Sequence, residues 1–206
     1  MKHFLIILLA IASLPLAAQQ PTGNAEKMIR EICDAASGIH SMQCRFRQTK
    51  SLSMLATQMV STGRMYYKNG MLRWEYLSPY KYVFIINGNR VLLESPSGSS
   101  VIDTKTNKMF GSIANIMMSS LTGNIINKEE FDTIMLESEE GWIAELTPVK
   151  KEMLQFFTKA RLYINPVEKK IEKVELTEKG GDTTLIEMTE IEKNISIDDS
   201  VFEIVH

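Results

Sequence analysis

The sequence predicts a mainly β protein of the α+β class, built as an incomplete antiparallel β-barrel of about eleven strands. Two Asn-Gly pairs, Asn69-Gly70 and Asn87-Gly88, each lie between alternating apolar runs, the strongest short-range signal for a β-hairpin. Further alternating runs continue to Glu192 in the order expected of a meander. Two stretches with apolar residues at helical spacing add an N-terminal helix and an inserted lid helix over the concave apolar face.

The N-terminal residues have the pattern of a secretory signal peptide. Lys2 precedes an apolar run, which small residues end at Ala17 and Ala18. The run is too short to span a bilayer, which argues against a membrane anchor. No cysteine follows the small residues, so the sequence offers no lipid-attachment site there. We expect a signal peptide at residues 1–18 and a single exported, soluble domain at residues 19–206.

The chain is slightly acidic. The full sequence has 23 Lys and Arg residues against 25 Asp and Glu residues. Cleavage after Ala18 would remove one lysine and no acidic residue, which leaves 22 basic and 25 acidic side chains and a net charge of −3. This balance argues against a nucleic-acid partner and against strong attraction to anionic lipid.

A helix is predicted at residues 25–37. Asn24 is suited to cap its N-terminus, and Gly38 is suited to end it. Its apolar residues, Met28 and Ile32 among them, fall on one side, so the helix is expected to pack on an apolar surface.

The two cysteines, Cys33 and Cys44, leave two alternatives open. Export permits a disulfide between them, and both are predicted to point toward the same core. Two buried free thiols would serve equally well as small apolar side chains.

Most strands are predicted from the alternation of apolar and polar residues. The first is expected around Met42, Cys44 and Phe46, and the second runs from a loop at 51–57 to Lys68. After the hairpins, strands are expected at Ser100–Asp103, Thr133–Glu137, Trp142–Thr147, Phe156–Ile164, Ile171–Glu178 and Thr183–Glu192.

Two-residue turns fix the register of the two hairpins, so cross-strand partners can be counted. Met65 is expected opposite Trp74 in the first hairpin, and Phe84 is expected opposite Val91 in the second. One face then collects apolar side chains: Met65, Tyr67, Leu72, Trp74, Tyr76, Tyr82, Phe84, Val91 and Leu93.

The opposite face of these hairpins is predicted to be hydrated. The same register sets Arg64 opposite Glu75 and Lys81 opposite Glu94, and such pairs of opposite charge stabilise a ladder modestly. A sheet with one apolar and one charged face is antiparallel and half buried. The apolar face therefore needs a cover.

The stretch Met109–Asn127 contains no charged residue and interrupts the β pattern. Apolar residues recur in it at helical spacing: Phe110, Ile113, Met117 and Leu121. One interpretation is an ordinary core helix, because Met-rich stripes usually fill gaps in cores. The other is a lid, apolar enough to dock on the sheet but rich in Gly and Ser, which lowers the free-energy cost of moving it.

A search for catalytic or metal-binding residues finds little. After signal cleavage His40 and His206 remain, too few for a His-based metal site or a proton-shuttling triad. No nucleophile elbow, phosphate-binding loop or dinucleotide fingerprint is present in the sequence. We therefore expect a binding protein rather than an enzyme, with no cofactor and no metal.

Taken together, these features resemble the LolA family of periplasmic outer-membrane lipoprotein carriers. The resemblance covers nearly the whole mature chain and rests on the N-terminal helix and on these sequence elements: Phe46-x-Gln48, Gly63, Leu72-Arg73-Trp74-Glu75-Tyr76-x-x-Pro79, the Asn87-Gly88 turn and Leu146-Thr147-Pro148. The run from Leu72 to Pro79 is the most specific of them.

The resemblance implies a monomeric periplasmic carrier whose apolar face binds lipoprotein acyl chains beneath a lid. Acylated lipoproteins would be the cargo, an inner-membrane ABC transporter of the LolCDE type the donor, and an outer-membrane protein the acceptor. The nine apolar-face residues above, Leu72 and Trp74 first, would face the lipid. Lys68 stands near the position of a family arginine that latches the lid, although the register points it to the other face.

Two alternatives to a lipoprotein carrier stay open. One is a carrier or sensor of another amphiphile, such as a fatty acid or a glycolipid. The other is a hydrolase of lipids or glycans, for which the sequence offers no catalytic set.

Overall fold

The computed structural model describes residues 20–21, 23–55, 57–107, 130–151, 153–155 and 157–204. The predicted signal peptide at residues 1–18 lies outside the described residues. The predicted lid helix, with Phe110, Ile113, Met117 and Leu121, also lies outside them. Both stay predictions.

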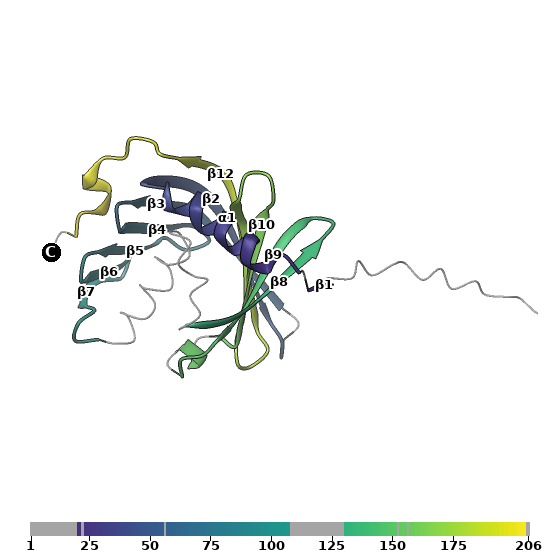
Figure 1. Cartoon of the computed structure of the whole chain (residues 1–206). Coiled ribbons are helices and arrows are strands. Elements are labelled where there is room, and N and C mark those ends of the chain that lie inside the picture. Colours follow the sequence, from purple (N-terminus) through teal and green to yellow (C-terminus); the bar gives the residue numbers. More distant parts are fainter. Residues whose placement is uncertain are drawn as a thin grey trace, which may run out of the picture.

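One antiparallel sheet holds all the strands that the structure describes, and it is not closed into a barrel (Figure 1). In chain order the strands are β1 (Gln20–Pro21), β2 (Ser41–Leu52), β3 (Thr57–Lys68), β4 (Met71–Ser78), β5 (Tyr82–Asn87), β6 (Arg90–Ser95), β7 (Gly98–Asp103), β8 (Phe131–Ser138), β9 (Gly141–Pro148), β10 (Lys159–Asn165), β11 (Lys170–Thr177) and β12 (Thr183–Lys193). The helices are α1 (Ala25–Ser37) and the 3-10 helices η2 (Met153–Gln155) and η3 (Asp199–Phe202). The order across the sheet is β1-β8-β9-β10-β11-β12-β2-β3-β4-β5-β6-β7. The predicted incomplete barrel is confirmed.

A few element bounds differ from prediction. The two-residue strand β1 was not expected, and β7 begins at Gly98 rather than Ser100. β10 begins at Lys159 rather than Phe156, because η2 precedes it and Phe157 packs into the core beneath α1. None of the helices in the described ranges is long and apolar enough to span a lipid bilayer.

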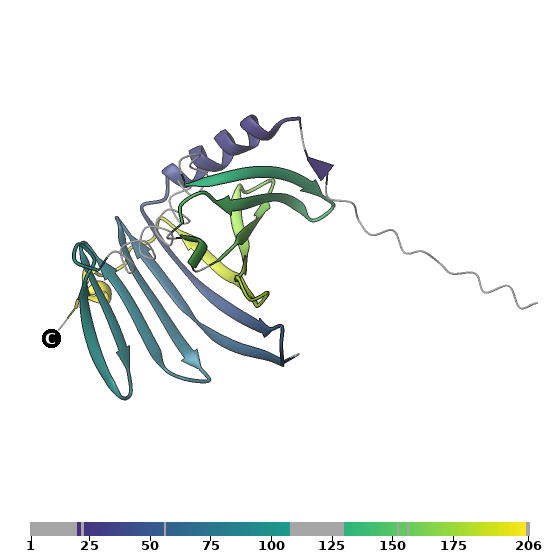
Figure 2. The same cartoon turned by 90° about the horizontal axis from the view of Figure 1, so that it is seen from below.

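The register makes one face of the sheet continuous across both halves. Paired residues share a face, and successive pairs join Leu162 of β10 to Val174 of β11, and Val174 to Ile186 of β12. Ile186 pairs with Gln48 of β2, and the alternate residues of β2 continue the same face through β3 to β6. We call it the inner face. Figure 2 shows the sheet bent between its β2–β7 and β8–β12 parts, with α1 running along β8.

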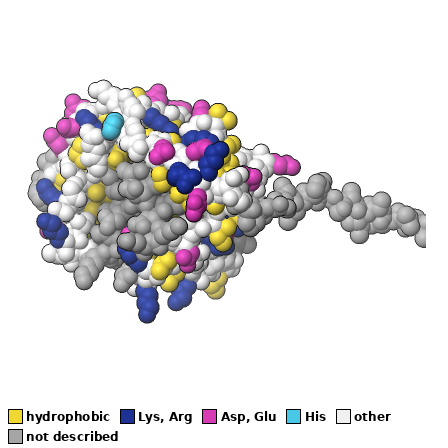
Figure 3. Space-filling model, in the orientation of Figure 1, with side chains coloured by type: hydrophobic (Ala, Val, Ile, Leu, Met, Phe, Trp, Pro, Cys, Tyr) yellow, Lys and Arg dark blue, Asp and Glu magenta, His cyan; other side chains and the backbone are white. Residues whose placement is uncertain are grey.

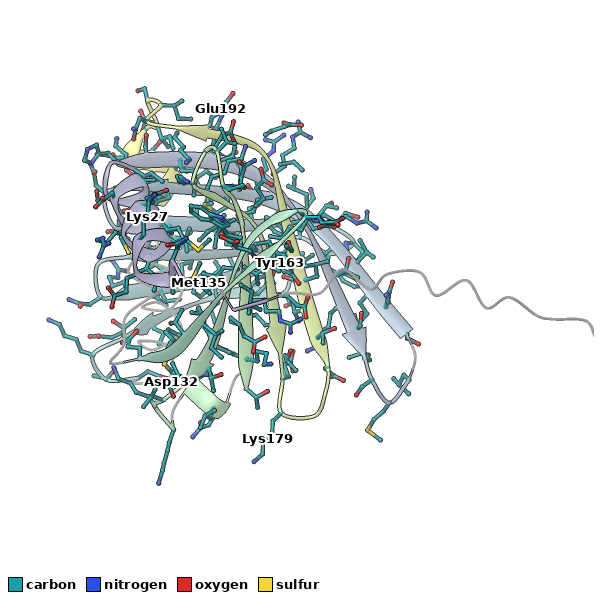
Figure 4. All side chains as sticks on the ribbon, turned by 45° about the vertical axis from the view of Figure 1, so that its right-hand side comes forward. Lys27, Asp132, Met135, Tyr163, Lys179 and Glu192 are labelled. Carbon is teal, nitrogen blue, oxygen red and sulfur yellow. The ribbon has the colours of Figure 1, made fainter. Side chains whose placement is uncertain are left out.

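Helix α1 covers the inner face beside β8, with the bounds that the sequence predicts. Met28 and Ile32 are buried against Met135 of β8, which Figure 4 labels near the helix. Their cluster, the α1 cluster, comprises Met28, Ile32, Phe131, Met135, Ala144, Leu146, Met153, Phe157, Ala160, Leu162 and Ile164. The capping prediction is wrong in one detail: the Met28 N–H donates to the Asn24 carbonyl at 3.1 Å, but the Asn24 side chain makes no capping hydrogen bond.

The first hairpin has the predicted turn and register. Asn69 and Gly70 have positive φ angles of 44° and 86°, as a type I′ turn requires. Met65 pairs with Trp74, and Arg64 pairs with Glu75.

The second hairpin turns one residue later than predicted. Its central residues are Gly88, with φ of 59°, and Asn89, which suits a turn that needs glycine at its first central position. The predicted pairs Phe84–Val91 and Lys81–Glu94 are therefore wrong, and Phe84–Leu93 and Val83–Glu94 replace them. The shift moves each partner by two residues, which preserves the alternation, so the predicted apolar face keeps its members.

The opposite face of β4 to β6 is covered rather than hydrated, which corrects the sequence prediction. The chain beyond β12 crosses it as a strap, residues 195–204, that includes η3. Phe202 is fully buried and packs in one cluster with Ile85 and Leu92. The Asn87 side-chain amide donates to the Phe202 carbonyl at 3.2 Å. This part of the sheet therefore carries a buried apolar cluster on each face.

An ion-pair group lies on β9 and β10. Glu145 accepts hydrogen bonds from Lys159 at 2.8 Å and from Arg161 at 2.9 Å. Burial opposes ionisation of Glu145, but the two cationic side chains outweigh it and hold its pKa below the ordinary value of 4.5.

Candidate functional site

All nine residues predicted on the apolar face lie in one hydrophobic cluster on the inner face. Five of them are buried: Met65, Tyr67, Leu72, Phe84 and Val91. Four are partly exposed and pack against the others: Trp74, Tyr76, Tyr82 and Leu93. The four partly exposed side chains are accessible in this structure, whereas Leu72 is fully buried, at 0% exposure.

Strands β2 and β12 add side chains that sequence reasoning did not assign to this face. Met42 and Phe46 of β2 are buried in the same cluster, and Ile186 and Met188 of β12 pack against it. The alternation within each strand was the available signal. It could not show that β2 and β12 pair, because the two strands lie at opposite ends of the chain.

Cys33 and Cys44 are not joined by a disulfide, and of the two alternatives Cys44 fits the second, a buried thiol. Cys44 is buried on the inner face, and burial raises its pKa to about 12. Cys33 on α1 is less buried, and its pKa is also raised, chiefly by burial and secondarily by the charge of Asp34. Cys44 therefore acts as a small apolar side chain.

An aromatic group joins β2 to β4 on the inner face. The Phe46 ring stacks on Trp74 with centroids 4.3 Å apart and meets Tyr76 edge-on at 5.2 Å. Gly63 of β3 makes room for it: a Cβ atom there would lie 2.0 Å from the Glu75 carbonyl oxygen and 2.4 Å from Phe46 Cζ. The glycine therefore allows the Phe46 ring to lie directly over the backbone of β3.

Three polar side chains interrupt this apolar surface, and we call Gln48, Trp74 and Tyr76 the polar island. The Tyr76 hydroxyl donates to Gln48 Oε1 at 2.9 Å. Burial raises the pKa of Tyr76, although hydrogen-bond donors on Trp74 and Gln48 oppose the rise, so the phenol is neutral at physiological pH. The effect of Trp74 on this pKa indicates that its indole N–H lies near the Tyr76 oxygen, but the two groups are not placed to form a hydrogen bond. The indole N–H is buried and has no partner within the described part of the chain.

Lys68, the predicted lid latch, lies on the face opposite the cluster, as the register indicated. Its ammonium donates to the Ile197 carbonyl and to the Asp199 carboxylate, each at 2.6 Å. Lys68 therefore holds the strap in place. The predicted contact with the lid involves residues outside the described ranges, so the latch role stays a prediction.

The inner face offers apolar contact area and a few hydrogen-bond donors. Among the residues that the structure describes, no group of three or more His, Cys, Asp or Glu side chains is placed to hold a metal ion. Figure 3 shows acidic and basic side chains intermixed on the visible surface rather than segregated by sign. The inner face therefore suits an apolar ligand with a weakly polar portion.

Comparison with known proteins places this geometry in a family. Residues 37–205 match the family model of the outer membrane lipoprotein carrier protein LolA. An uncharacterized conserved protein from Thermus thermophilus has a similar fold, with a TM-score of 0.54 and 11% identity over 88% of this chain and 94% of that chain. A LolA superfamily protein from Nitrosomonas europaea aligns with a TM-score of 0.47 and 13% identity over 87% and 97% of the two chains. No curated protein sequence matches the chain.

Proposed function

Because the chain belongs to the LolA family of outer membrane lipoprotein carrier proteins, we propose that it carries the acyl chains of lipoproteins on its inner face. In this proposal the protein is a monomer that works in the periplasm. It takes acylated lipoproteins from an inner-membrane ABC transporter of the LolCDE type and delivers them to the outer membrane, where an acceptor protein receives them. It acts by binding and not by catalysis.

The observation that supports this function best is the continuity of the inner face. A single apolar surface passes from the α1 cluster through Val174 and Ile186 to the cluster that contains Trp74 and Leu93. An acyl chain gains about 0.8 kcal/mol for each buried CH₂ group, so a long apolar surface can hold several chains at once. The four partly exposed side chains supply its accessible portion.

Release is as important as binding for a carrier. A protein that buried several acyl chains on a rigid, dry surface would bind its cargo at the practical limit of non-covalent affinity and would not release it. In the proposed mechanism the uncharged stretch that contains Met117 competes with cargo for the inner face. Cargo must displace this lid to enter, which subtracts from the net affinity.

The direct test is native mass spectrometry of protein purified from the periplasm of cells that express the full chain. The proposal expects co-purified lipoprotein or its acylated N-terminal fragment. A folded protein that instead carries free fatty acid or glycolipid would contradict the lipoprotein role. It would favour the carrier of another amphiphile.

A matched pair of variants tests the location of the site. Leu93→Asp puts a charge among the partly exposed residues of the inner face. Leu77→Asp puts the same charge on β4 at a position outside the inner-face cluster, where Leu77 is 43% exposed. Saturable binding of a fluorescent acyl probe should be weakened by Leu93→Asp and kept by Leu77→Asp, with circular dichroism to confirm folding. Equal binding by both folded variants would place the site elsewhere.

A further inference from the structure

The end of the β2–β3 hairpin is apolar and extends beyond the neighbouring strand β4. Thr62 of β3 pairs with Ser78, the last residue of β4, so residues 57–61 of β3 pair with β2 alone among the described strands. Large apolar side chains are exposed on this part of the hairpin, and we call them the hairpin tip: Met54 at 93%, Leu55 at 69%, Met59 at 54% and Val60 at 37%. None of them belongs to the inner-face cluster.

Hydrogen bonds hold the turn that carries the hairpin tip. The backbone N–H and the hydroxyl of Ser53 donate to the Asp182 carboxylate at 2.9 and 3.0 Å, which ties this turn to the turn between β11 and β12. The Leu55 N–H donates to the Leu52 carbonyl at 3.2 Å, and the Thr57 hydroxyl donates to the Leu55 carbonyl at 3.0 Å. A hydrogen-bonded turn that presents several large apolar side chains together to solvent is typical of an interaction site.

The sequence around the hairpin tip favours a lipid bilayer as the partner. Residues 51–63 contain no charged side chain, so the tip can enter the bilayer interface without removing a charge from water. The side chains stand at the end of an extended hairpin rather than around a groove, and a fluid bilayer needs no matching pocket to receive them. Tyr80, in the β4–β5 turn at the same end of the sheet, is 78% exposed and is of a residue type enriched at membrane interfaces.

The charges beside the hairpin tip complement the phosphate groups of a bilayer surface. The Glu178 carboxylate is held by Lys50 at 2.7 Å, and the Asp182 carboxylate is held by the turn itself. Lys81 and Lys179 are exposed, and neither forms an ion pair with another residue in the described part of the chain. Figure 4 shows Lys179 projecting from the end of its turn. Such lysines can contact lipid phosphates while the neighbouring apolar side chains enter the bilayer.

We propose that the hairpin tip inserts shallowly into a lipid bilayer, so that the protein docks reversibly on a membrane surface by the end of its β2–β3 hairpin. Met54 and Leu55 enter first, because they are the most exposed. Membrane binding scales with the apolar area that enters the bilayer, so a few side chains give a weak attachment that is easily reversed. The docking site is separate from the inner face and does not depend on what the inner face carries.

The test is flotation of the full mature chain with vesicles of phosphatidylethanolamine and phosphatidylglycerol. The wild-type protein should float with the vesicles, and a variant with both Met54→Asp and Leu55→Asp should bind about tenfold more weakly. Val167→Asp is the matched control, because Val167 is 87% exposed in the β10–β11 turn at the opposite end of β11, and it should leave binding unchanged. Lys179→Gln should weaken binding to these anionic vesicles about fivefold at low salt.

Insertion is measured separately from attachment with an indole at the hairpin tip. The fluorescence of Leu55→Trp should shift to shorter wavelength when vesicles are added, because the indole leaves water. Val167→Trp should show no shift beyond the background of Trp74 and Trp142 in the wild-type protein.

The outcomes distinguish docking from the proposed function. Absence of wild-type flotation, or wild-type flotation of the folded Met54→Asp, Leu55→Asp variant, overturns the docking site and leaves the carrier function standing. An equal loss in Val167→Asp overturns it as well. Leu93→Asp, on the inner face, should weaken acyl-probe binding but keep flotation, whereas the tip variant should do the reverse. Loss of flotation in folded Leu93→Asp but not in the tip variant would mean that vesicles bind the inner face, and docking by the hairpin tip would be wrong.

Discussion

Replacing Gly63 by alanine should destabilise the protein strongly. The added Cβ atom would lie 2.0 Å from the Glu75 carbonyl oxygen, 2.4 Å from Phe46 Cζ and 2.7 Å from Phe46 Cε1. Ordinary van der Waals contact begins at 3.4 Å, so the backbone of β4 would have to retreat by about 1.4 Å and the Phe46 ring by about 1.0 Å. The backbone contact cannot be relieved by rotating a side chain.

The expected magnitude follows from two contributions. Overpacking of a core costs about 1–3 kcal/mol. Displacement of Phe46 also weakens its contacts with Trp74 and Tyr76, and an aromatic pair is worth about 0.5–1.5 kcal/mol beyond its buried area. A combined loss of about 3 kcal/mol lowers the melting temperature of a domain of this size by about 6–12 °C.

The assay is thermal unfolding followed by circular dichroism, with Gly38→Ala as the matched control. Gly38 has φ of −82°, and no heavy atom lies within 4 Å of the position a Cβ would take. The control should melt at the wild-type temperature or slightly above it, because alanine reduces the entropy of the unfolded chain. A Gly63→Ala variant that melts within about 2 °C of the control would refute the packing argument, since a loss of about 3 kcal/mol cannot be hidden there.

Three further predictions concern other parts of the structure. Glu145→Gln should lower the free energy of unfolding at neutral pH, because a carboxylate whose folded-state pKa is below 4.5 stabilises the fold at pH values above 4.5. The difference from wild type should shrink as the pH falls through the folded-state pKa of Glu145. Urea unfolding at several pH values measures it. Phe202→Ala should lower the free energy of unfolding in urea by about 3–5 kcal/mol, because a fully buried ring is removed. Leu77→Ala, at an exposed position, should change it by no more than about 0.5 kcal/mol. Similar losses in the two variants would contradict a tightly packed strap. A thiol reagent at neutral pH should label Cys33 before Cys44, whose pKa is about 12, and equal labelling rates in the native protein would contradict the burial of Cys44.

Local sequence patterns were sufficient for the inner face of the hairpins. Asn69-Gly70 fixed a turn in which both residues need positive φ, and the count of partners from it was correct. The second turn moved by one residue because Gly88 satisfies either of two turn types, depending on which neighbour joins it. The apolar face survived that error, since the period of a strand is two.

Long-range contacts were beyond the sequence. The alternation within β12 does not show that β2 is its neighbour. The apolar residues of the strap do not show which part of the sheet they cover, so the contact of Phe202 with Ile85 and Leu92 could not be predicted. The polar island was missed for the same reason. Trp74 and Tyr76 share a strand, but Gln48 joins them only through the pairing of β2 with β3 and of β3 with β4.

The pairing of β2 with β12 has a consequence for the order of folding. Ser51 of β2 faces Thr183 of β12, so these neighbours are 132 positions apart in the sequence. Strands β2 to β7 can assemble hairpin by hairpin from local contacts, but β2 keeps an unpaired edge until β12 is available. Until β12 pairs with it, the half-sheet exposes a strand edge and apolar residues on both faces, which makes this the folding stage most prone to aggregation.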